Sequence, residues 1–441
     1  MKRRLFALGL AAALCLSLLS GCGAKSSTPS GTGSSGNNSA GGKVYYLNFK
    51  PEQDAQWQEL ADLYTKETGV EVTVFTAASG NYETTLKSEM AKTDAPTLFQ
   101  VNGPVGLAAW KDYCYDLTGS DIASQLTSKE FALMDGDKMA GIGYVIETYG
   151  IIYNKALLEK AGYSADDIKS FADLKKVAED ITARKDELGF SAFTSAGMDG
   201  GSSWRFTGHV ANLEYYYESV DDPAAWEQCP AELTGAYMDN YRNLLELMFA
   251  NSTVDRSELA TGGFDANAEF ANGEAVFYVN GSWTWSDLSG MGMTADQLAM
   301  IPYYCGVEGE EKAALNCGTE NYWAVNSEAS EEDIQATLDF MYWLVTDPEA
   351  SELAVATFGV MPYKQAAESA NPFFVDANNY LAQGNYNMWW ATNYQPNVDA
   401  YREALVSAIN GYNANPCDDT WATVVTAFVD GWAVQYQAAQ G

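Results

Sequence analysis

Short β-rich runs that alternate with amphipathic segments constrain the fold of this chain more than any other feature. Residues 44–49 are aromatic and apolar, and residues 57–64 place apolar side chains at the i, i+3, i+4, i+7 spacing of a helix buried on one face. A second β-rich run follows at 70–75, then a helical segment at 82–92 and a third apolar run at 97–101. This order predicts an α/β lobe built on a mainly parallel sheet.

The same alternation returns in the second half of the chain, after a hairpin predicted at Asp135-Gly136. We expect further strands at 150–153, 189–193, 275–279 and 318–325, and further helices at 173–187, 203–219, 233–250 and 331–345. The chain has 441 residues, which is more than a single hydrophobic core ordinarily serves. Two α/β lobes therefore describe it better than one long sheet.

The N-terminal residues have the pattern of an export signal. Three basic residues at positions 2–4 precede an apolar run over 5–19, which at about 1.5 Å per residue is shorter than the ~30 Å core of a bilayer. We therefore predict a signal peptide over residues 1–21. The Gly- and Ser-rich residues that follow cannot collapse into a core, which predicts a flexible linker over residues 22–42.

Charge and composition exclude several classes of site and partner. The chain carries 59 acidic and 25 basic residues, a formal net charge of −34, which argues against nucleic acid and anionic lipid as partners. His209 is the single histidine, and we assign it a structural role, so no metal site and no cofactor are expected. The cysteines after residue 22 are odd in number and scattered, which does not indicate a disulfide framework. Whether Cys305 and Cys317 form a bridge stays an open question at this point.

The end of the predicted signal carries a short and specific motif, Leu19-Ser20-Gly21-Cys22. This motif resembles the lipobox of bacterial lipoproteins, in which the cysteine is lipidated and becomes the new N-terminus. The resemblance implies a lipid on Cys22 and a location on the outer face of the bacterial cell membrane. The lipid would be the protein's only contact with the membrane.

Further motifs recur in a fixed order through most of the mature chain. They are Tyr64-x-Lys66-Glu67-Thr68-Gly69-Val70-x-Val72, Gly150-Ile-Ile-Tyr-Asn154-Lys155, Phe270-x-Asn272-Gly273-Glu274-Ala275 with Asn280-Gly281-Ser282-Trp283, and Tyr322-Trp323-Ala324-Val325-Asn326 with Gly359-x-Met361-Pro362. Each one is short, but their order and spacing together are specific. The set resembles the extracellular solute-binding proteins of ABC sugar importers, the maltose-binding-like family 1.

That resemblance implies a periplasmic-binding-protein-like fold of two lobes joined by hinge crossovers, with the solute in a cleft between them. By analogy, one lobe comprises residues 43–145 and 300–357, and the other comprises 146–299 and 358–441. The implied protein is a monomeric receptor rather than an enzyme. It would capture a sugar, more specifically an oligosaccharide, by closure of its lobes and deliver it to the transmembrane subunits of an ABC permease.

Aromatic residues are the first candidates for the solute site, because a pyranose can stack its C–H face on a Trp or Tyr ring. The family's pocket commonly includes the Trp after the Asn-Gly turn, which is Trp283 here, with Trp285 as a neighbouring candidate. Tyr401 falls near the position of another stacking ring in the family. The remaining candidates are a ring that follows a Gly-rich loop and a pair in the aromatic stretch near the C-terminus, namely Trp204, Trp389 and Trp390.

Polar side chains next to the expected strands are the second set of candidates. Ligands bind at the carboxyl ends of strands in open α/β sheets, and sugar hydroxyls need fixed hydrogen-bond donors and acceptors. The candidates are Asp54, Gln56 and Asn102 in the first lobe, Glu147 at the first crossover, Arg205 beside Trp204, and Glu320 and Asn321 before the strand at 322–326.

Other functions remain open on the sequence alone. An exported glycoside hydrolase would have a similar wealth of aromatic residues and would need two carboxylates flanking the scissile bond, but no pair is singled out by spacing. A solute-binding protein for a non-sugar ligand such as a peptide is a second alternative, and a surface adhesin is a third. Turnover of an oligosaccharide would favour the hydrolase, and stoichiometric binding without products would favour the receptor.

Overall fold

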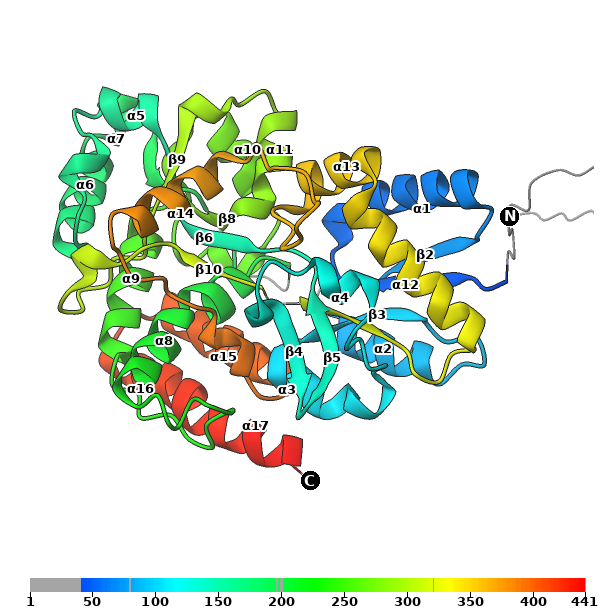
Figure 1. Ribbon diagram of the computed structural model, residues 1–441. Helices are drawn as coiled ribbons and strands as arrows, with labels where there is room; N and C mark the ends of the chain where they lie inside the picture. The colour runs from blue at the N-terminus through cyan, green and yellow to red at the C-terminus, as the bar shows by residue number, and fades with distance from the viewer. Residues whose placement is uncertain (1–40, 79–80, 196, 199–200, 320, 441) are drawn as a thin grey trace, which may run out of the picture. The chain divides into compact units, whose positions relative to one another are not determined.

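Two mixed sheets organise the chain, and Figure 1 shows each of them with its covering helices. The computed structural model describes residues 41–78, 81–195, 197–198, 201–319 and 321–440. The predicted signal peptide, Cys22 and nearly all of the predicted linker therefore lie outside the described residues, as does Glu320.

The first sheet has the strand order β2-β1-β3-β11-β5-β4. Its strands are β1 (Val44–Asn48), β2 (Val72–Thr76), β3 (Leu98–Asn102), β4 (Ala132–Asp135), β5 (Lys138–Gly143) and β11 (Asn321–Val325). β1 pairs in parallel with β2 and β3, but every pairing that involves β11, β5 or β4 is antiparallel. The sheet is therefore mixed and not mainly parallel, because the Asp135-Gly136 hairpin, which is confirmed, and a returning strand complete it.

Both faces of this sheet are buried, because successive strand residues point to opposite sides. Tyr46 and Trp323 lie on one face and Leu47 and Phe99 on the other. The first face is covered by α1 (Asp54–Thr68), α4 (Asp121–Gln125), α12 (Glu331–Thr346) and α13 (Pro348–Phe358), and the second by α2 (Tyr82–Met90) and α3 (Gly103–Trp110). We call this sheet with its helices the first lobe.

The second sheet is centred on β6 (Glu147–Asn154), a long strand that is almost completely buried. The order is β10-β6-β8-β7, and β9 also pairs with β6. The other strands are β7 (Ser191–Phe193), β8 (Ala275–Gly281), β9 (Leu298–Ile301) and β10 (Asn316–Gly318). β10 pairs with the start of β6 and β9 with its end, so two short strands share one edge of β6.

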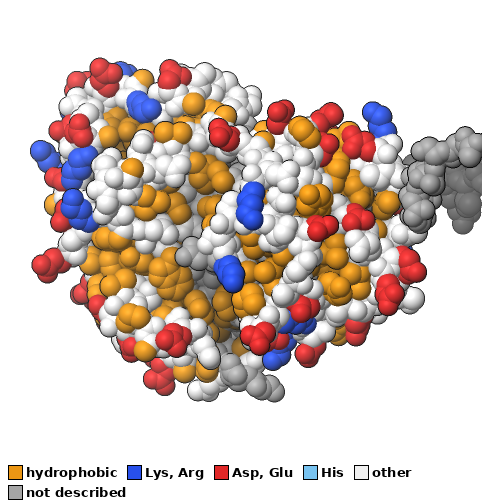
Figure 2. All heavy atoms as spheres, in the orientation of Figure 1, with side chains coloured by type: hydrophobic (Ala, Val, Ile, Leu, Met, Phe, Trp, Pro, Cys, Tyr) orange, Lys and Arg blue, Asp and Glu red, His pale blue; other side chains and the backbone are white. Residues whose placement is uncertain are grey.

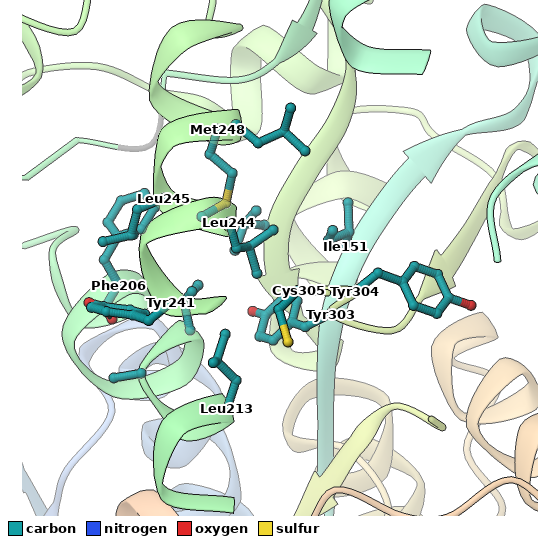
Figure 3. Packing of buried hydrophobic residues seen from close by; sticks show 14 of the residues in the cluster. Ile151, Phe206, Leu213, Tyr241, Leu244, Leu245, Met248, Tyr303, Tyr304 and Cys305 are labelled. Atoms are coloured by element: carbon teal, nitrogen blue, oxygen red, sulfur yellow. The ribbon is translucent and has the colours of Figure 1, made fainter. Parts of the chain in front are cut away.

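Helices cover both faces of the second sheet, and we call this assembly the second lobe. One face packs against α5 (Lys155–Lys160), α6 (Phe171–Ala183), α7 (Lys185–Leu188), α8 (Asn212–Asp221), α9 (Met238–Ala250), α15 (Val398–Ala414), α16 (Asp418–Val425) and α17 (Gly431–Gln440). The other packs against α10 (Ala266–Ala271), α11 (Trp285–Gly290) and α14 (Pro372–Ala382). Figure 3 shows the first of these cores, where Leu244 of α9 and Ile151 of β6 approach Tyr303 while Tyr304 points away from the helix.

Local signals in the sequence set the ends of several helices. α1 ends at Gly69, whose φ of 79° is the left-handed conformation that glycine adopts at low cost. α6 begins after Ser170, whose side chain accepts a hydrogen bond from the backbone N–H of Asp173. Asp347 caps α13 in the same way, and Pro348 occupies the first turn, where its missing N–H costs nothing.

Strand pairing moves two of the predicted lobe boundaries. Residues 300–318 were expected in the first lobe, but β9 and β10 both pair with β6, and the chain returns to the first sheet only at Asn321. Residues just after 358 were expected in the second lobe, but Val360 bridges to Ile146 and Tyr363 is buried in the first-lobe core. Motif positions alone could not locate these crossovers, because they depend on which strand edges remain to be paired.

Gly42 and Lys43 fix where the folded body begins. Gly42 has a φ of +110°, and a Cβ there would lie 2.3 Å from the backbone oxygen of Glu332, so only glycine fits. The backbone N–H of Lys43 donates to Asp333 at 2.8 Å, and the Lys43 ammonium pairs with Asp94. The start of the body is thereby attached to the first turn of α12.

Candidate functional site

Five rings from four segments of the second lobe form a cluster that includes Trp283. The centroid of the Trp283 ring lies 5.0 Å from that of His209, 5.8 Å from that of Trp204 and 6.3 Å from that of Tyr149. Tyr149 stacks on His209 with centroids 4.3 Å apart and lies 5.0 Å from Trp390. We call these five residues the ring cluster. The sequence analysis proposed Trp204, Trp283 and Trp390 as site residues, and the structure brings these three together.

Gly281 sets the position of the Trp283 ring. β8 is buried along its whole length and ends at Gly281, after which the chain turns so that the ring of Trp283 folds back over the glycine. A Cβ at position 281 would lie 2.2 Å from carbon atoms of that ring. The Asn280-Gly281 turn noted in the sequence therefore has a steric reason, which is to make room for the indole. Trp283 itself stays half-buried.

A π-helix over Arg205–Val210 brings His209 next to Trp204. The wider turn of a π-helix is uncommon and is often found at functional sites. The two rings meet edge to face with centroids 5.0 Å apart. The Nε1–H of Trp204 donates to the backbone oxygen of Gly201 at 2.9 Å, which fixes the orientation of the indole. Periodicity predicts an ordinary helix here and gives no sign of this irregularity.

Asn212 holds the segment that carries Trp390. Its Nδ2 donates to Asn316 at 3.0 Å and to the backbone oxygen of Trp389 at 3.1 Å, and its Oδ1 accepts from the N–H of Thr392 at 2.9 Å. The Nε1–H of Trp390 donates to the backbone oxygen of Asn316 at 3.0 Å. Asn212 is fully buried, so this network positions the Trp390 ring without solvent. Sequence reasoning did not single out Asn212.

A buried ion pair between Lys50 and Glu147 joins the two lobes beside the ring cluster. Lys50 follows β1 in the first lobe, and Glu147 is the first residue of β6 in the second. Both side chains are nearly inaccessible, at 7% and 2% exposed. Asn48 shapes the turn before the pair, because its Oδ1 accepts from the N–H of Lys50 and its Nδ2 donates to the Lys50 backbone oxygen. The Lys50 ammonium lies 5.6 Å from the centroid of the Trp283 ring, a cation–π distance.

The surroundings of His209 keep its imidazole neutral. Burial lowers the pKa of His209 well below its usual value, and the neighbouring cations Arg402, Lys50 and Arg205 lower it further. A neutral imidazole can stack on Tyr149 without bringing a further positive charge to the cluster. The prediction of a structural role for His209 agrees with its burial, although the ring also forms part of the wall around Trp283.

The first lobe contributes side-chain amides that lack partners. Asn102 ends β3 and Asn321 begins β11, and the two are paired directly across the strands. The Oδ1 of Asn102 and both polar side-chain atoms of Asn321 are buried without a hydrogen-bond partner among the described residues. The Oε1 of Gln56 is also buried without a hydrogen-bond partner among these residues. Buried polar atoms without partners are rare and costly, so they mark places where a ligand or water completes the hydrogen bonds.

The structure places four of the predicted site residues elsewhere. Asp54 begins α1 and accepts hydrogen bonds from Thr76 and Gln58. The remaining three are rings packed in other aromatic groups: Trp285 against Phe373, Trp389 against Trp226 and Tyr394, and Tyr401 against Phe428 and Trp432. Tyr401 is fully buried, and its hydroxyl donates to the backbone oxygen of Phe428 at 2.7 Å. Glu320 lies outside the described residues.

The residues matched by a family profile cover most of the folded chain. The profile of the bacterial extracellular solute-binding proteins matches residues 59–382. The chain belongs to this family.

Solved structures with the same fold match nearly the whole of this solute-binding protein. The raffinose complex of the solute-binding protein RafE has a TM-score of 0.67 at 15% identity, with 90% of this chain and 100% of that chain covered. A chitin oligosaccharide binding protein has a TM-score of 0.69 at 16% identity, with 90% and 98% covered. A family 1 extracellular solute-binding protein from Bifidobacterium longum subsp. infantis has a TM-score of 0.61 at 20% identity, with 89% and 100% covered. These likenesses establish the two-lobe fold; no curated protein matches the sequence.

Membership of this family places the solute-binding protein outside the cytoplasm. In the described part of the chain, no helix combines the length and the apolar character that crossing a bilayer requires.

Cys305 and Cys317 are both free thiols, so these two cysteines do not form the disulfide bridge that the sequence left open. Figure 2 shows acidic side chains spread around the face in view and not gathered into one patch, as expected for a solvated surface.

Lys50, Tyr149, His209 and Asn212 are parts of the candidate site that the sequence did not predict. Lys50 had a usable signal, since it follows the first strand and lies shortly before α1, where Asp54 and Gln56 were proposed. Tyr149 lies in β6, whose continuous run of buried residues predicts a packing role in the core. Their roles depend on tertiary contacts between segments that are distant in sequence, and no local pattern reports these contacts.

Proposed function

We propose that this solute-binding protein is the receptor of an ABC importer and captures a sugar, more specifically an oligosaccharide, between its lobes. The observation that carries the proposal is the ring cluster beside a buried ion pair that spans both lobes. Rings that are fixed in place bind the apolar face of a pyranose at little cost in side-chain entropy. Related structures bound raffinose and stachyose, and another is named for chitin oligosaccharide.

The two lobes offer different halves of such a site. Trp283 presents a half-buried indole from the second lobe. Among the described residues of the first lobe, Asn321 presents a whole amide and Asn102 an amide oxygen without partners, and these suit hydroxyl groups, which both donate and accept. A ligand that contacts both lobes stabilises their closed arrangement, because closure depends on the difference in binding free energy between the two states.

The proposed receptor carries out no chemistry on its solute. A glycoside hydrolase needs two carboxylates flanking the scissile bond, one of them able to donate a proton. Glu147, the carboxylate that adjoins the ring cluster, is instead held in an ion pair with Lys50. Incubation with an oligosaccharide followed by chromatography should return the sugar intact, and shorter products would contradict this part of the proposal.

Attachment by a lipid on Cys22 and delivery to the transmembrane permease subunits complete the proposal. Support for the anchor is the motif Leu19-Ser20-Gly21-Cys22 after an export-signal pattern. In bacteria that express the full chain, the wild type should sediment with membranes and carry acyl chains by mass spectrometry. The Cys22→Ala variant should lose both properties, and an unacylated wild type would contradict the anchor.

The decisive experiment is a binding screen with the purified wild type. A panel of glucose, galactose, N-acetylglucosamine, maltotriose, raffinose, stachyose and chitotriose would be tested by thermal shift and then by titration calorimetry. A ligand that binds only the folded form raises the melting temperature by mass action. We expect at least one oligosaccharide to bind with 1:1 stoichiometry, and no binding by any panel member would contradict the sugar assignment.

A further inference from the structure

A polar pocket lies in the second lobe, next to the ring cluster but outside it. The pocket has a volume of about 360 Å³. Its lining includes Ser202 and Arg205 from the segment around Trp204, Asp265 and Asn267 from the start of α10, and Tyr278 from β8. By contrast, a second cavity between Phe193 and Phe249 measures only about 10 Å³ and has no room for a solute.

Arg205 connects this pocket to the ring cluster. Its guanidinium lies over the Trp204 ring with 4.3 Å between Cζ and the ring centroid, and Trp204 in turn contacts Trp283 and His209. Arg205 therefore lines the pocket while it stacks on a ring of the cluster. A solute that extends past Trp204 would meet Arg205 at the wall of the pocket.

The hydrogen bonds of Arg205 leave it able to bind more. Its Nη2 donates to the hydroxyl of Tyr278 at 3.2 Å, and its Nη1 donates to the backbone oxygen of Ser202 at 3.3 Å. Its Nε is buried without a hydrogen-bond partner, and no ion pair involves Arg205 within the described ranges. The guanidinium of Arg205 therefore keeps hydrogen-bond donor capacity that a ligand can use.

A network of hydrogen bonds holds the floor of the pocket in place. The Tyr278 hydroxyl donates to Asn267 Oδ1 at 2.8 Å, and the Thr284 hydroxyl donates to the same atom at 2.7 Å. Asn267 Nδ2 donates to Asp287 at 2.9 Å. Asp265 is held as the cap of α10, because its Oδ1 accepts from the N–H of Ala268 at 3.0 Å. Pocket walls that are already fixed lose little entropy when a ligand binds.

The charges in the pocket favour a neutral ligand rich in hydroxyl groups. Arg205 supplies donors and Asp265 supplies an acceptor, and a sugar hydroxyl can use both. Asp265 disfavours an anionic ligand, and Arg205 disfavours a cationic one. We infer that this pocket binds a second, neutral sugar unit of the same solute, so that it selects oligosaccharides over monosaccharides. This inference rests on the proposed function. It adds the residues that make the affinity depend on the number of sugar units in the solute.

The test compares affinities for a short and a long ligand in the same variants. The oligosaccharide that binds tightest in the panel above and its constituent monosaccharides would be titrated by calorimetry into the wild type, Arg205→Gln and Asp265→Asn. The Asp265→Asn change keeps a side-chain oxygen that can cap α10 and removes the charge. We expect each variant to bind the oligosaccharide at least tenfold more weakly and the monosaccharides within twofold of the wild type.

Two controls make the result specific. Arg184→Gln removes an arginine that pairs with Asp180 at the end of α6, and it should change neither affinity. Circular dichroism melting curves establish that each variant is folded. Equal loss for the short and long ligands, or no loss for either, would overturn the inference alone. A wild type that binds only monosaccharides would overturn the inference and the oligosaccharide part of the proposed function, but not the sugar assignment. A wild type that binds no sugar at all would overturn the proposed function and the inference with it.

Discussion

The two lobes differ in the kind of group that they present at the proposed site. In the second lobe, the indole N–H groups of Trp204 and Trp390 donate to backbone oxygens, and a fully buried asparagine holds the segment behind them. In the first lobe, Asn102 and Asn321 keep buried amide atoms without partners among the described residues. At the ring cluster the second lobe therefore supplies mainly a fixed surface for stacking, with hydrogen-bonding capacity beyond it at Arg205, whereas the first lobe supplies amide groups that a ligand can complete.

The ion pair between the lobes should give the largest effect when broken. The Lys50→Met substitution leaves Glu147 buried without its partner, and loss of one member of a buried pair typically costs about 3–5 kcal/mol. The double variant Lys50→Met/Glu147→Leu should recover most of this free energy of unfolding, because no charge is then buried alone. Urea denaturation measures both, and a Lys50→Met variant as stable as the wild type would show that the pair does not hold this junction.

The second lobe should also lose stability as the pH rises, through Glu214 of α8. Burial raises the pKa of Glu214 to about 9, and the carboxylate of Glu218 one turn further raises it as well. The folded state therefore keeps a proton that the unfolded state releases above about pH 4.5, so this contribution is complete at low pH and is lost between about pH 4.5 and 9.

The slope expected from one proton is about 1.4 kcal/mol per pH unit, or roughly 3 kcal/mol between pH 6 and 8. Denaturation of the wild type and of Glu214→Gln across this range measures the difference between them. Glutamine carries no proton to lose, so the variant should be more stable at pH 8 and its stability should change less with pH. Parallel curves for the two proteins would contradict the assignment.

Stacking by the second lobe is tested by a pair of neighbouring tryptophans. The Trp283→Ala variant should lower sugar affinity by about 1–3 kcal/mol, as for loss of a central aromatic contact. Trp285→Ala is the matched control, because that ring packs against Phe373 and not in the ring cluster. Calorimetry with the tightest sugar of the panel measures both. An equal loss in the two variants would mean that general loosening, and not the Trp283 face, explains the change.

Hydrogen bonding by the first lobe is tested by two asparagines at the two ends of β11. Asn321→Ala should lower affinity by about 1 kcal/mol and leave stability nearly unchanged, because its amide has no hydrogen-bond partner among the described residues to lose. Asn326→Ala should do the opposite, since Asn326 donates to the backbone oxygen of Pro96 at 3.0 Å. Calorimetry and urea denaturation together separate the two cases. A stability loss at Asn321 that matches the loss at Asn326 would refute the contrast between the lobes.

The sequence predicts the elements of this fold better than their pairing. The apolar run at 97–101 and the stripe over 57–64 correspond to β3 and α1, because burial on defined faces imposes a local period. The position of β10 is not predictable in this way, because it depends on the open edge of β6 left beside β9. The mixed character of the first sheet has the same origin.

The residues of the candidate site also separate into those with a local signal in the sequence and those whose role depends on tertiary contacts. Trp283 could be found because a turn motif precedes it and family resemblance gives it a role. Lys50 could be noticed because it follows a strand, but its ion pair could not be predicted, because Glu147 lies 97 residues away in the chain. Tyr401 is a candidate only because the family resemblance places a stacking ring near it, but its hydroxyl and ring make contacts within the core. Aromatic composition alone does not distinguish a ring that faces a ligand from one that packs the interior.

The attachment of Gly42 and Lys43 to α12 has a mechanical consequence. A pull on the N-terminus enters the folded body at the first turn of that helix, through the backbone contact of Gly42 with Glu332 and the bond from Lys43 to Asp333. The load would therefore be carried first by the lobe that holds the unpaired amides, while the aromatic lobe stays out of the direct line of force.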